Sequence, residues 1–181
     1  MAKEVSVCLS LGSNMGDRRG NIDKAAGLIA QRLRVEKMSS VYDTTPQDNQ
    51  HQPNFLNMVL RAYTTLEPLA LLTLLKAIES KLGRTHSAGR YQPRPIDIDI
   101  LYYDDIELDL PTLTIPHPRI PERAFVLVPL AEIAPDLKHP VTGKTPEQML
   151  TELQKGVQGV FKFAEACTFE NKPEPRETRS N

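Results

Sequence analysis

Two aspartates separated by one residue carry the clearest chemical signal in the sequence. They lie in the run Ile96-Asp97-Ile98-Asp99-Ile100, where acidic and apolar residues alternate. This period of two predicts a β-strand with both carboxylates on one face, about 6–7 Å apart. Such carboxylates repel each other unless a cation lies near them, and Mg²⁺ takes one or two carboxylates together with substrate phosphates. A strand with a solvated acidic face is the alternative.

A basic segment leads directly into this acidic strand. Residues 80–96 contain Lys81, Arg84, Arg90 and Arg94 and no acidic residue, a local charge of +4 in a chain of net charge −1. Arginine offers fork-shaped donors that suit phosphate oxygens, and a metal opposite them completes a clamp on a polyphosphate. Phosphoryl transfer is catalysed mostly by this kind of positioning and charge neutralisation. The combination favours a Mg-nucleotide enzyme over the alternative, a solvated basic surface.

Length and composition exclude several other classes of protein. With 181 residues, 40% hydrophobic and 25% charged, the chain fits one globular domain and neither collagen nor a coiled coil. A net charge of −1 provides no general attraction to nucleic acid or to an anionic membrane. Cys8 and Cys167 are too few for a disulfide framework, and the most apolar stretch, 66–78, is shorter than the ~20 residues of a membrane span. We therefore expect a cytoplasmic protein without nucleic-acid or membrane partners.

The periodicity of the remaining chain predicts the elements that position these residues. Alternating apolar residues at 5–11 predict a first strand, and 12–16 a turn, after which Asp17 can cap a helix with an apolar stripe. Thr65 can cap a second helix, which has Pro68 in its first turn and ends at Gly83. Further strands are expected at 37–42, 55–63, 96–103 and 108–115, and further helices near 122–130 and 145–153.

The order β-α-β-β-α-β is typical of the ferredoxin-like fold. We therefore expect an α+β domain with a split βαβ core, a mainly antiparallel sheet and added C-terminal helices. The domain is expected to span residues 1–166, and the polar residues 167–181 to form a disordered tail. Long polar segments at 43–54 and 84–95 connect its elements, and loops of this length are often functional.

The basic segment and the acidic strand together resemble a known family signature. Residues 90–101 read RYQPRPIDIDIL, which is similar to the R-W-G-P-R-x-x-D-L-D-I-L motif of 6-hydroxymethyl-7,8-dihydropterin pyrophosphokinases. Other motifs of this family are matched in the same order by LGSN and GDR at 11–18, TTP at 44–46, Gln52 with FLN at 55–57, Glu79 with LGR at 82–84, and IPHP at 115–118 with Arg123, Phe125, Val126 and PL at 129–130. The resemblance spans residues 5 to about 166. Five motifs in sequence are far more specific than one.

The resemblance implies an enzyme of folate biosynthesis. It transfers the β,γ-pyrophosphoryl group of ATP to the hydroxymethyl group of a reduced pterin and releases AMP. Asp97 and Asp99 resemble the ligands of two Mg²⁺ ions that bridge the ATP phosphates, and Asp99 also resembles a residue that orients or deprotonates the attacking hydroxyl. Arg84 and Arg94 resemble the arginines that engage the phosphates; a surface charge is the alternative for each.

Three more residues resemble ATP contacts of the family. They are His117, Arg123 and Glu79. A purely structural hydrogen bond is the alternative for His117, and a solvated helix face is the alternative for Glu79.

A second group resembles the pterin site of the family. Phe55 and Phe125 match the aromatic pair that stacks on both faces of the pterin ring. Asn57 matches the amide that offers a donor and an acceptor to the ring edge, and Thr44 a neighbouring contact. On a strand, Phe55 and Asn57 share a face, as a joint role requires. Two phenylalanines of the hydrophobic core are the alternative.

Several positions depart from the family pattern. Tyr91 and Gln92 stand in place of Trp-Gly, His86 in place of a common arginine, and Thr45 in place of a second proline. Gln47-Asp48-Asn49 replaces an apolar residue and a glycine. None of these changes removes a metal ligand or a flanking arginine, so they bear on loop closure and on the wall of the pterin pocket.

Two rival functions use the same residues differently. Another Mg-dependent nucleotidyltransferase normally needs a third carboxylate and a Gly-Ser loop before the aspartate pair, and neither is evident in the sequence. A non-catalytic ferredoxin-like module that binds RNA carries basic and aromatic residues on its sheet face, where Asp97 and Asp99 would repel phosphates. We expect a monomeric enzyme with ATP, Mg²⁺ and a reduced 6-hydroxymethylpterin as its ligands.

Overall fold

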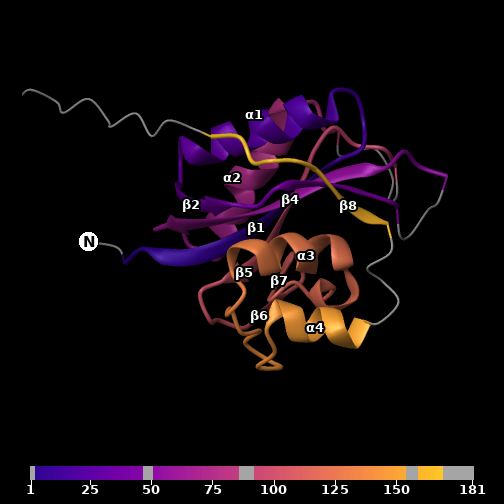
Figure 1. The fold of residues 1–181 in the computed structure, drawn as a ribbon. Helices are drawn as coiled ribbons and strands as arrows, with labels where there is room; N and C mark the ends of the chain where they lie inside the picture. Colours follow the sequence, from indigo (N-terminus) through magenta and orange to yellow (C-terminus); the bar gives the residue numbers. More distant parts are fainter. Residues whose placement is uncertain (1–2, 47–50, 86–91, 154–158, 169–181) are drawn as a thin grey trace, which may run out of the picture.

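An antiparallel sheet lies between two layers of helices (Figure 1). The computed structural model describes residues 3–46, 51–85, 92–153 and 159–168. Strand β1 (Val5–Ser13) pairs with β4 (Phe55–Thr64) on one side and with β5 (Asp97–Tyr103) on the other. Beyond β4 the sheet continues through β3 (Val41–Thr44) to β8 (Val160–Ala164), and β2 (Arg34–Met38) also pairs with β4. Every strand pairing within the described ranges is antiparallel.

The connections confirm the predicted ferredoxin-like α+β fold. Helix α1 (Arg18–Ala30) connects β1 to β2, and α2 (Pro68–Lys81) connects β4 to β5. Because β4 lies beside β1 and β1 beside β5, each βαβ unit is split by a strand of the other. The C-terminal helices expected from the sequence are α3 (Ala124–Ile133) and α4 (Pro146–Leu153), preceded by a short 3₁₀ helix at Ile120–Glu122.

Helices α1 and α2 cover one face of the sheet, and their ends follow the sequence signals closely. The carboxylate of Asp17 accepts a hydrogen bond from the N–H of Gly20 at 2.9 Å, which confirms the predicted cap of α1. Gly83, with φ +92°, ends α2 as predicted. The predicted cap at Thr65 is wrong, because α2 begins after Glu67 with Pro68 at its first position, where a missing N–H costs nothing.

Helices α3 and α4 cover part of the opposite face. Apolar side chains of the adjacent strands β1, β4 and β5 form a second core with them, including Cys8, Val59 and Leu101. Burial raises the pKa of the Cys8 thiol to about 12, as befits the small apolar residue expected from the sequence. None of the helices in the described ranges is long and apolar enough to cross a membrane.

Four element predictions need correction. Residues 37–42 are not one strand, because Ser39 interrupts the ladder by accepting the Val59 N–H through its side chain at 3.0 Å, so that β2 and β3 are separate. Residues 108–115 form a hairpin, β6 (Leu108–Leu110) and β7 (Leu113–Ile115). The 12–16 turn is shorter than predicted, because Gly12 and Ser13 still belong to β1. Strand β8 was not predicted at all.

Candidate active site

The adjacent strands β5, β1 and β4 share one face of the sheet, which runs from under α3 into an open cavity. Under α3 this face is apolar, at Cys8, Val59 and Leu101. Beyond these three residues, two further side-chain positions of each strand lie on the same face. They are Ser10 and Gly12 in β1, Asn57 and Phe55 in β4, and Asp99 and Asp97 in β5. All six line a cavity of about 700 Å³, a volume typical of a small-molecule site. The predicted sharing of a face by both aspartates, and by Phe55 and Asn57, is confirmed.

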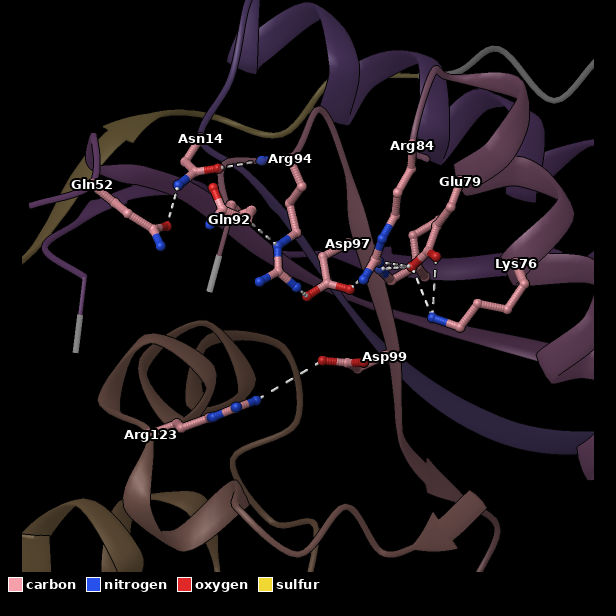
Figure 2. A network of polar contacts seen from close by, with 11 residues as sticks. Asn14, Gln52, Lys76, Glu79, Arg84, Gln92, Arg94, Asp97, Asp99 and Arg123 are labelled. Atoms are coloured by element: carbon pink, nitrogen blue, oxygen red, sulfur yellow. Dashed lines mark hydrogen bonds and ion pairs between the residues drawn. The ribbon is translucent and has the colours of Figure 1, made fainter. Parts of the chain in front are cut away.

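Asp97 lies between the two predicted arginines (Figure 2). Nη1 of Arg84 contacts Oδ1 of Asp97, and Nη1 of Arg94 donates to Oδ2 at 3.0 Å. Arg84 follows the end of α2, and Arg94 comes three residues before Asp97, so the two reach the carboxylate from different elements. Charges that repel phosphate and charges that attract it therefore meet at one wall of the cavity.

Glu79 is a buried anchor behind this wall. Its side chain is 0% exposed and accepts the backbone N–H of Ile98 at 2.7 Å. The same carboxylate pairs with Arg84 at 2.7 Å and with Lys76 at 3.1 Å (Figure 2). Burial raises the pKa of Glu79, and the nearby cations and the Ile98 N–H offset this only in part. The alternative of a solvated helix face is wrong, and Glu79 is not among the residues that line the cavity.

The two aspartates differ in their electrostatic surroundings. Burial raises the pKa of Asp97, but the charges of Arg84 and Arg94 outweigh this effect and hold the pKa below its ordinary value. For Asp99, burial and then the charge of Asp97 raise the pKa to about 6. A third of the Asp99 side chain faces open space, and Arg123 lies 3.9 Å away. Two neighbouring carboxylates with separated pKa values are typical of functional sites.

Residues between β7 and the first turn of α3 line another part of the cavity. Arg123, Phe125 and His117 all line the cavity, and the guanidinium carbon of Arg123 lies 5.4 Å from the centre of the Phe125 ring. Nδ1 of His117 accepts the N–H of Arg119 at 3.2 Å, so the structural hydrogen bond that was the alternative for His117 is present, and the residue also lines the cavity. Burial and then the charges of Arg123 and Arg119 lower the pKa of His117 to about 4. The imidazole is therefore neutral at physiological pH.

The far end of the cavity is less charged. Asn57 is buried, and its amide donates to the hydroxyl of Thr44 at 2.6 Å, which leaves the amide oxygen on the Gly12 side. A Cβ at Gly12 would lie 2.7 Å from that oxygen, so only glycine fits under it. Phe55 lies beside Gly12 at this end, and Phe125 lines the same cavity from α3. The predicted pterin residues are thus brought together.

Sequence reasoning overlooked the role of Asn14, which joins the two ends of the cavity. Its side-chain oxygen accepts the N–H of Arg94 at 2.8 Å, and its amide nitrogen donates to Gln52 at 3.0 Å (Figure 2). The Asn14 N–H also donates to the Arg94 carbonyl at 3.3 Å. The LGSN motif could have indicated that Asn14 belongs to the site, but local sequence predicts only a turn there.

Some predicted features lie outside the described residues. These are Gln47-Asp48-Asn49, His86, Arg90, Tyr91 and the tail from residue 169. In the part of the chain that the structure describes, no group of three or more His, Cys, Asp or Glu side chains could hold a metal ion by itself. A cation at Asp97 and Asp99 would therefore need oxygen ligands from a substrate or water, which suits Mg²⁺.

The fold and this cavity define an α+β enzyme that acts on a phosphorylated substrate. A family model described as 7,8-dihydro-6-hydroxymethylpterin-pyrophosphokinase (HPPK) matches residues 8–135. The 2-amino-4-hydroxy-6-hydroxymethyldihydropteridine pyrophosphokinase of Bacillus subtilis is 40% identical over 157 residues, 86% of this chain and 93% of that protein. The enzyme of the same name from Aquifex aeolicus is 42% identical over 139 residues, 77% of this chain and 86% of that protein. The chain belongs to the HPPK family.

Solved structures agree on the fold. Wild-type Plasmodium falciparum HPPK-DHPS with pteroate has a TM-score of 0.67 at 18% identity, over 83% of this chain and 42% of that longer chain. The chain spans less than half of the length of such bifunctional proteins. Family membership removes the two rival functions: the chain is a pyrophosphokinase that transfers pyrophosphate from ATP to 6-hydroxymethyl-7,8-dihydropterin in folate biosynthesis.

Proposed function

We propose that the two ends of this single cavity hold the two substrates of the reaction, ATP at the charged end and the dihydropterin at the Phe55 end. The observation that carries the proposal is the position of Asp97 and Asp99 on the same face of the sheet as Phe55 and Asn57, in one cavity. With both substrates bound, the pterin hydroxyl attacks the β-phosphorus of ATP. The bond from that phosphorus to the oxygen shared with the α-phosphate breaks, AMP leaves, and the hydroxyl proton is released.

Asp97 and Asp99 are proposed to hold two Mg²⁺ ions with the ATP phosphates. The donor set fits, since two carboxylates face one cavity and the remaining ligands can be phosphate oxygens and water. Bound Mg²⁺ supplies neutralisation of phosphate charge and alignment of the reacting oxygens. A cation favours the ionised form of Asp99, whose pKa of about 6 would otherwise leave it partly protonated. Asp99 is then the carboxylate that orients the pterin hydroxyl.

Arg84 and Arg94 are proposed to engage the phosphates. Arg84 contacts both Glu79 and Asp97 through the single nitrogen Nη1. A guanidinium carries five N–H donors, so each arginine can hold phosphate oxygens and still stay close to Asp97. Arg123 and His117 complete the ATP site from the α3 side, and neutral His117 can donate one hydrogen bond to a nucleotide group. Glu79 acts on ATP through Arg84, which it positions.

The pterin ring is proposed to stack between Phe55 and Phe125. The ring is flat and has donors and acceptors along one edge, which Asn57 and Thr44 can bind. Gly12 lies beneath the Asn57 oxygen, so no side chain displaces the amide from this edge. The expected monomer stays a prediction.

A coupled assay for AMP tests the proposal. Full-length protein with ATP, Mg²⁺ and 6-hydroxymethyl-7,8-dihydropterin should release AMP, and omission of the pterin should abolish the release. Asp109→Asn, a change of an exposed carboxylate on β6, serves as a control and should leave the rate unchanged. AMP release without the pterin, or ADP in place of AMP, would refute the assignment.

A further inference from the structure

Strand β8 lies beyond the residues that the family model matches and was not predicted from the sequence. It forms the end of the sheet and pairs with β3, so that Thr44 lies opposite Val160. Thr44, Thr45 and Pro46 follow one another along the wall of the cavity at its pterin end. The last strand in the described residues therefore supports the residues that we assign to the pterin site.

The contact between β8 and this wall is close and specific. The N–H of Thr45 donates to the carbonyl of Gly159 at 3.0 Å. Gly159 has φ +88°, a conformation that favours glycine, and a Cβ there would overlap Oγ1 of Thr45. Any other residue at 159 would push Thr45 away or displace the strand.

The other end of β8 is anchored separately. Ser40 donates its N–H at 3.0 Å and its hydroxyl at 2.8 Å to Glu132 of α3, and the same hydroxyl lies 3.2 Å from the carboxylate of Glu165, directly after β8. Between the two anchors, β8 pairs with all four residues of β3. A side chain added at position 159 should therefore displace Thr45 more readily than it displaces the strand.

We propose that β8 is a positioning strand for the pterin pocket and that Gly159 is its critical residue. By fixing Thr45, Gly159 holds Thr44 where its hydroxyl accepts the Asn57 amide, which orients that amide for the pterin edge. The charged end does not depend on β8, because ion pairs among α2, β5 and Arg94 organise it. The inference rests on the proposed pterin site, and it predicts that a change in β8 alters pterin binding while ATP binding stays the same.

Gly159→Ala in the full-length protein tests this inference. Calorimetric titration with 6-hydroxymethyl-7,8-dihydropterin should show roughly 5- to 30-fold weaker binding than wild type. Titration with a Mg²⁺ complex of a non-hydrolysable ATP analogue should show unchanged affinity. Equal loss for both ligands, or loss for neither, overturns the proposal.

Gly143→Ala is the matched control. Gly143 also has a positive φ, +69°, but a Cβ there meets open space, and the residue does not line the cavity. This variant carries the same kind of backbone strain, so it should lose stability and keep pterin affinity. If Gly143→Ala weakens pterin binding as much as Gly159→Ala, the effect is general strain and the proposal fails.

A double variant tests whether the loss of pterin affinity comes from the contact between residues 159 and 45 or from a general loss of folding. In the double variant Thr45→Ala/Gly159→Ala the overlapping Oγ1 is absent, so pterin affinity should recover relative to Gly159→Ala; no recovery overturns the proposal. If Gly159→Ala alone does not fold, the double variant should still fold and bind pterin as tightly as Thr45→Ala, and weaker binding by the double variant again overturns the proposal. Absence of pterin binding by the wild type would instead refute the proposed function itself.

Discussion

The two ends of the cavity are built by different forces. The charged end draws most of its residues from a short stretch, Arg84 to Asp99, and ion pairs hold them together. The pterin end gathers Thr44, Asn57 and Phe125 from three separate elements: strand pairing and a neutral hydrogen bond hold Thr44 and Asn57, and Phe125 packs against the core under α3. A site for a polyphosphate needs concentrated charge, whereas a site for a flat polar ring needs shape. The difference explains why one end is compact in sequence and the other is dispersed.

The charges at the charged end of the cavity are nearly balanced. Four cationic side chains surround three carboxylates there: Lys76, Arg84, Arg94 and Arg123 with Glu79, Asp97 and Asp99. The net charge of this cluster is +1 when all seven groups are ionised. An anionic nucleotide and a cation can both be accommodated, because each finds groups of opposite sign within the same cluster.

Removal of a carboxylate at the charged end should have the largest effect. Asp97→Ala should lower kcat on the order of 10³-fold or more, because loss of a metal ligand forfeits several kcal/mol of charge stabilisation. It should also lower the unfolding temperature, since Arg84 and Arg94 both lose an ion-pair partner. Steady-state rates at saturating Mg²⁺ check the first effect and thermal unfolding the second. Near-wild-type turnover would disprove the metal assignment.

Loss of an arginine should have the next largest effect. Arg84→Ala and Arg94→Ala should each lower kcat by roughly 30- to 1000-fold, the effect of about 2–4 kcal/mol, and change substrate affinities less. The charge of these groups acts most strongly where phosphate charge moves during transfer. Arg34→Ala, which removes the exposed pair with Glu4 and a stacking contact with Tyr63, is the control; none of these residues lines the cavity, so the variant should keep wild-type kinetics. A rise in KM with unchanged kcat would show that the arginines bind the substrate and the transition state equally, which contradicts the prediction.

At the pterin end, Phe55→Ala should weaken pterin binding by about 1–3 kcal/mol, by analogy with base–aromatic stacking, and leave ATP binding unchanged. Phe125→Ala should differ, because its ring lies against Arg123, which in turn lies near Asp99. That variant should weaken pterin binding similarly and also lower ATP affinity slightly. Separate titrations with each ligand distinguish the two. Loss of ATP affinity with intact pterin affinity in Phe55→Ala would invalidate the pterin site.

The smallest expected effect is a pH dependence of stability at His117. Burial and the charges of Arg123 and Arg119 lower its pKa in the folded protein to about 4, whereas the unfolded chain takes up this proton near ~6.5. The free energy of unfolding should therefore decrease as pH falls through this window. His117→Asn, which keeps an acceptor for the Arg119 N–H, should show a weaker decrease in denaturant titrations at pH 7, 6 and 5. Parallel pH profiles for wild type and variant would contradict the prediction.

Local sequence was sufficient for features that depend on spacing. Alternation in β1 and β5, the Asp17 cap and the Gly83 terminus are properties of a few neighbouring residues, and each occurs in the structure as predicted. Features that depend on a distant partner were predicted poorly. The break between β2 and β3 arises from a hydrogen bond between Ser39 and Val59, which no periodicity reveals. Strand β8 was overlooked although VFKF favours a strand, because its phenylalanines are exposed and its position in the sheet depends on pairing with the distant β3.

For the site, the sequence by itself determined which residues supply charge, stacking and hydrogen bonds, and the order of its motifs indicated the family. Only the tertiary structure decided how deeply each group is buried and which charges and hydrogen bonds surround it. It buried Glu79 completely and made it an anchor for Arg84, where the sequence allowed a solvated helix face. It placed Asn14 between Arg94 and Gln52. Burial and charge at a given atom depend on the whole packed molecule, because removal of water from a group requires neighbours from many parts of the chain.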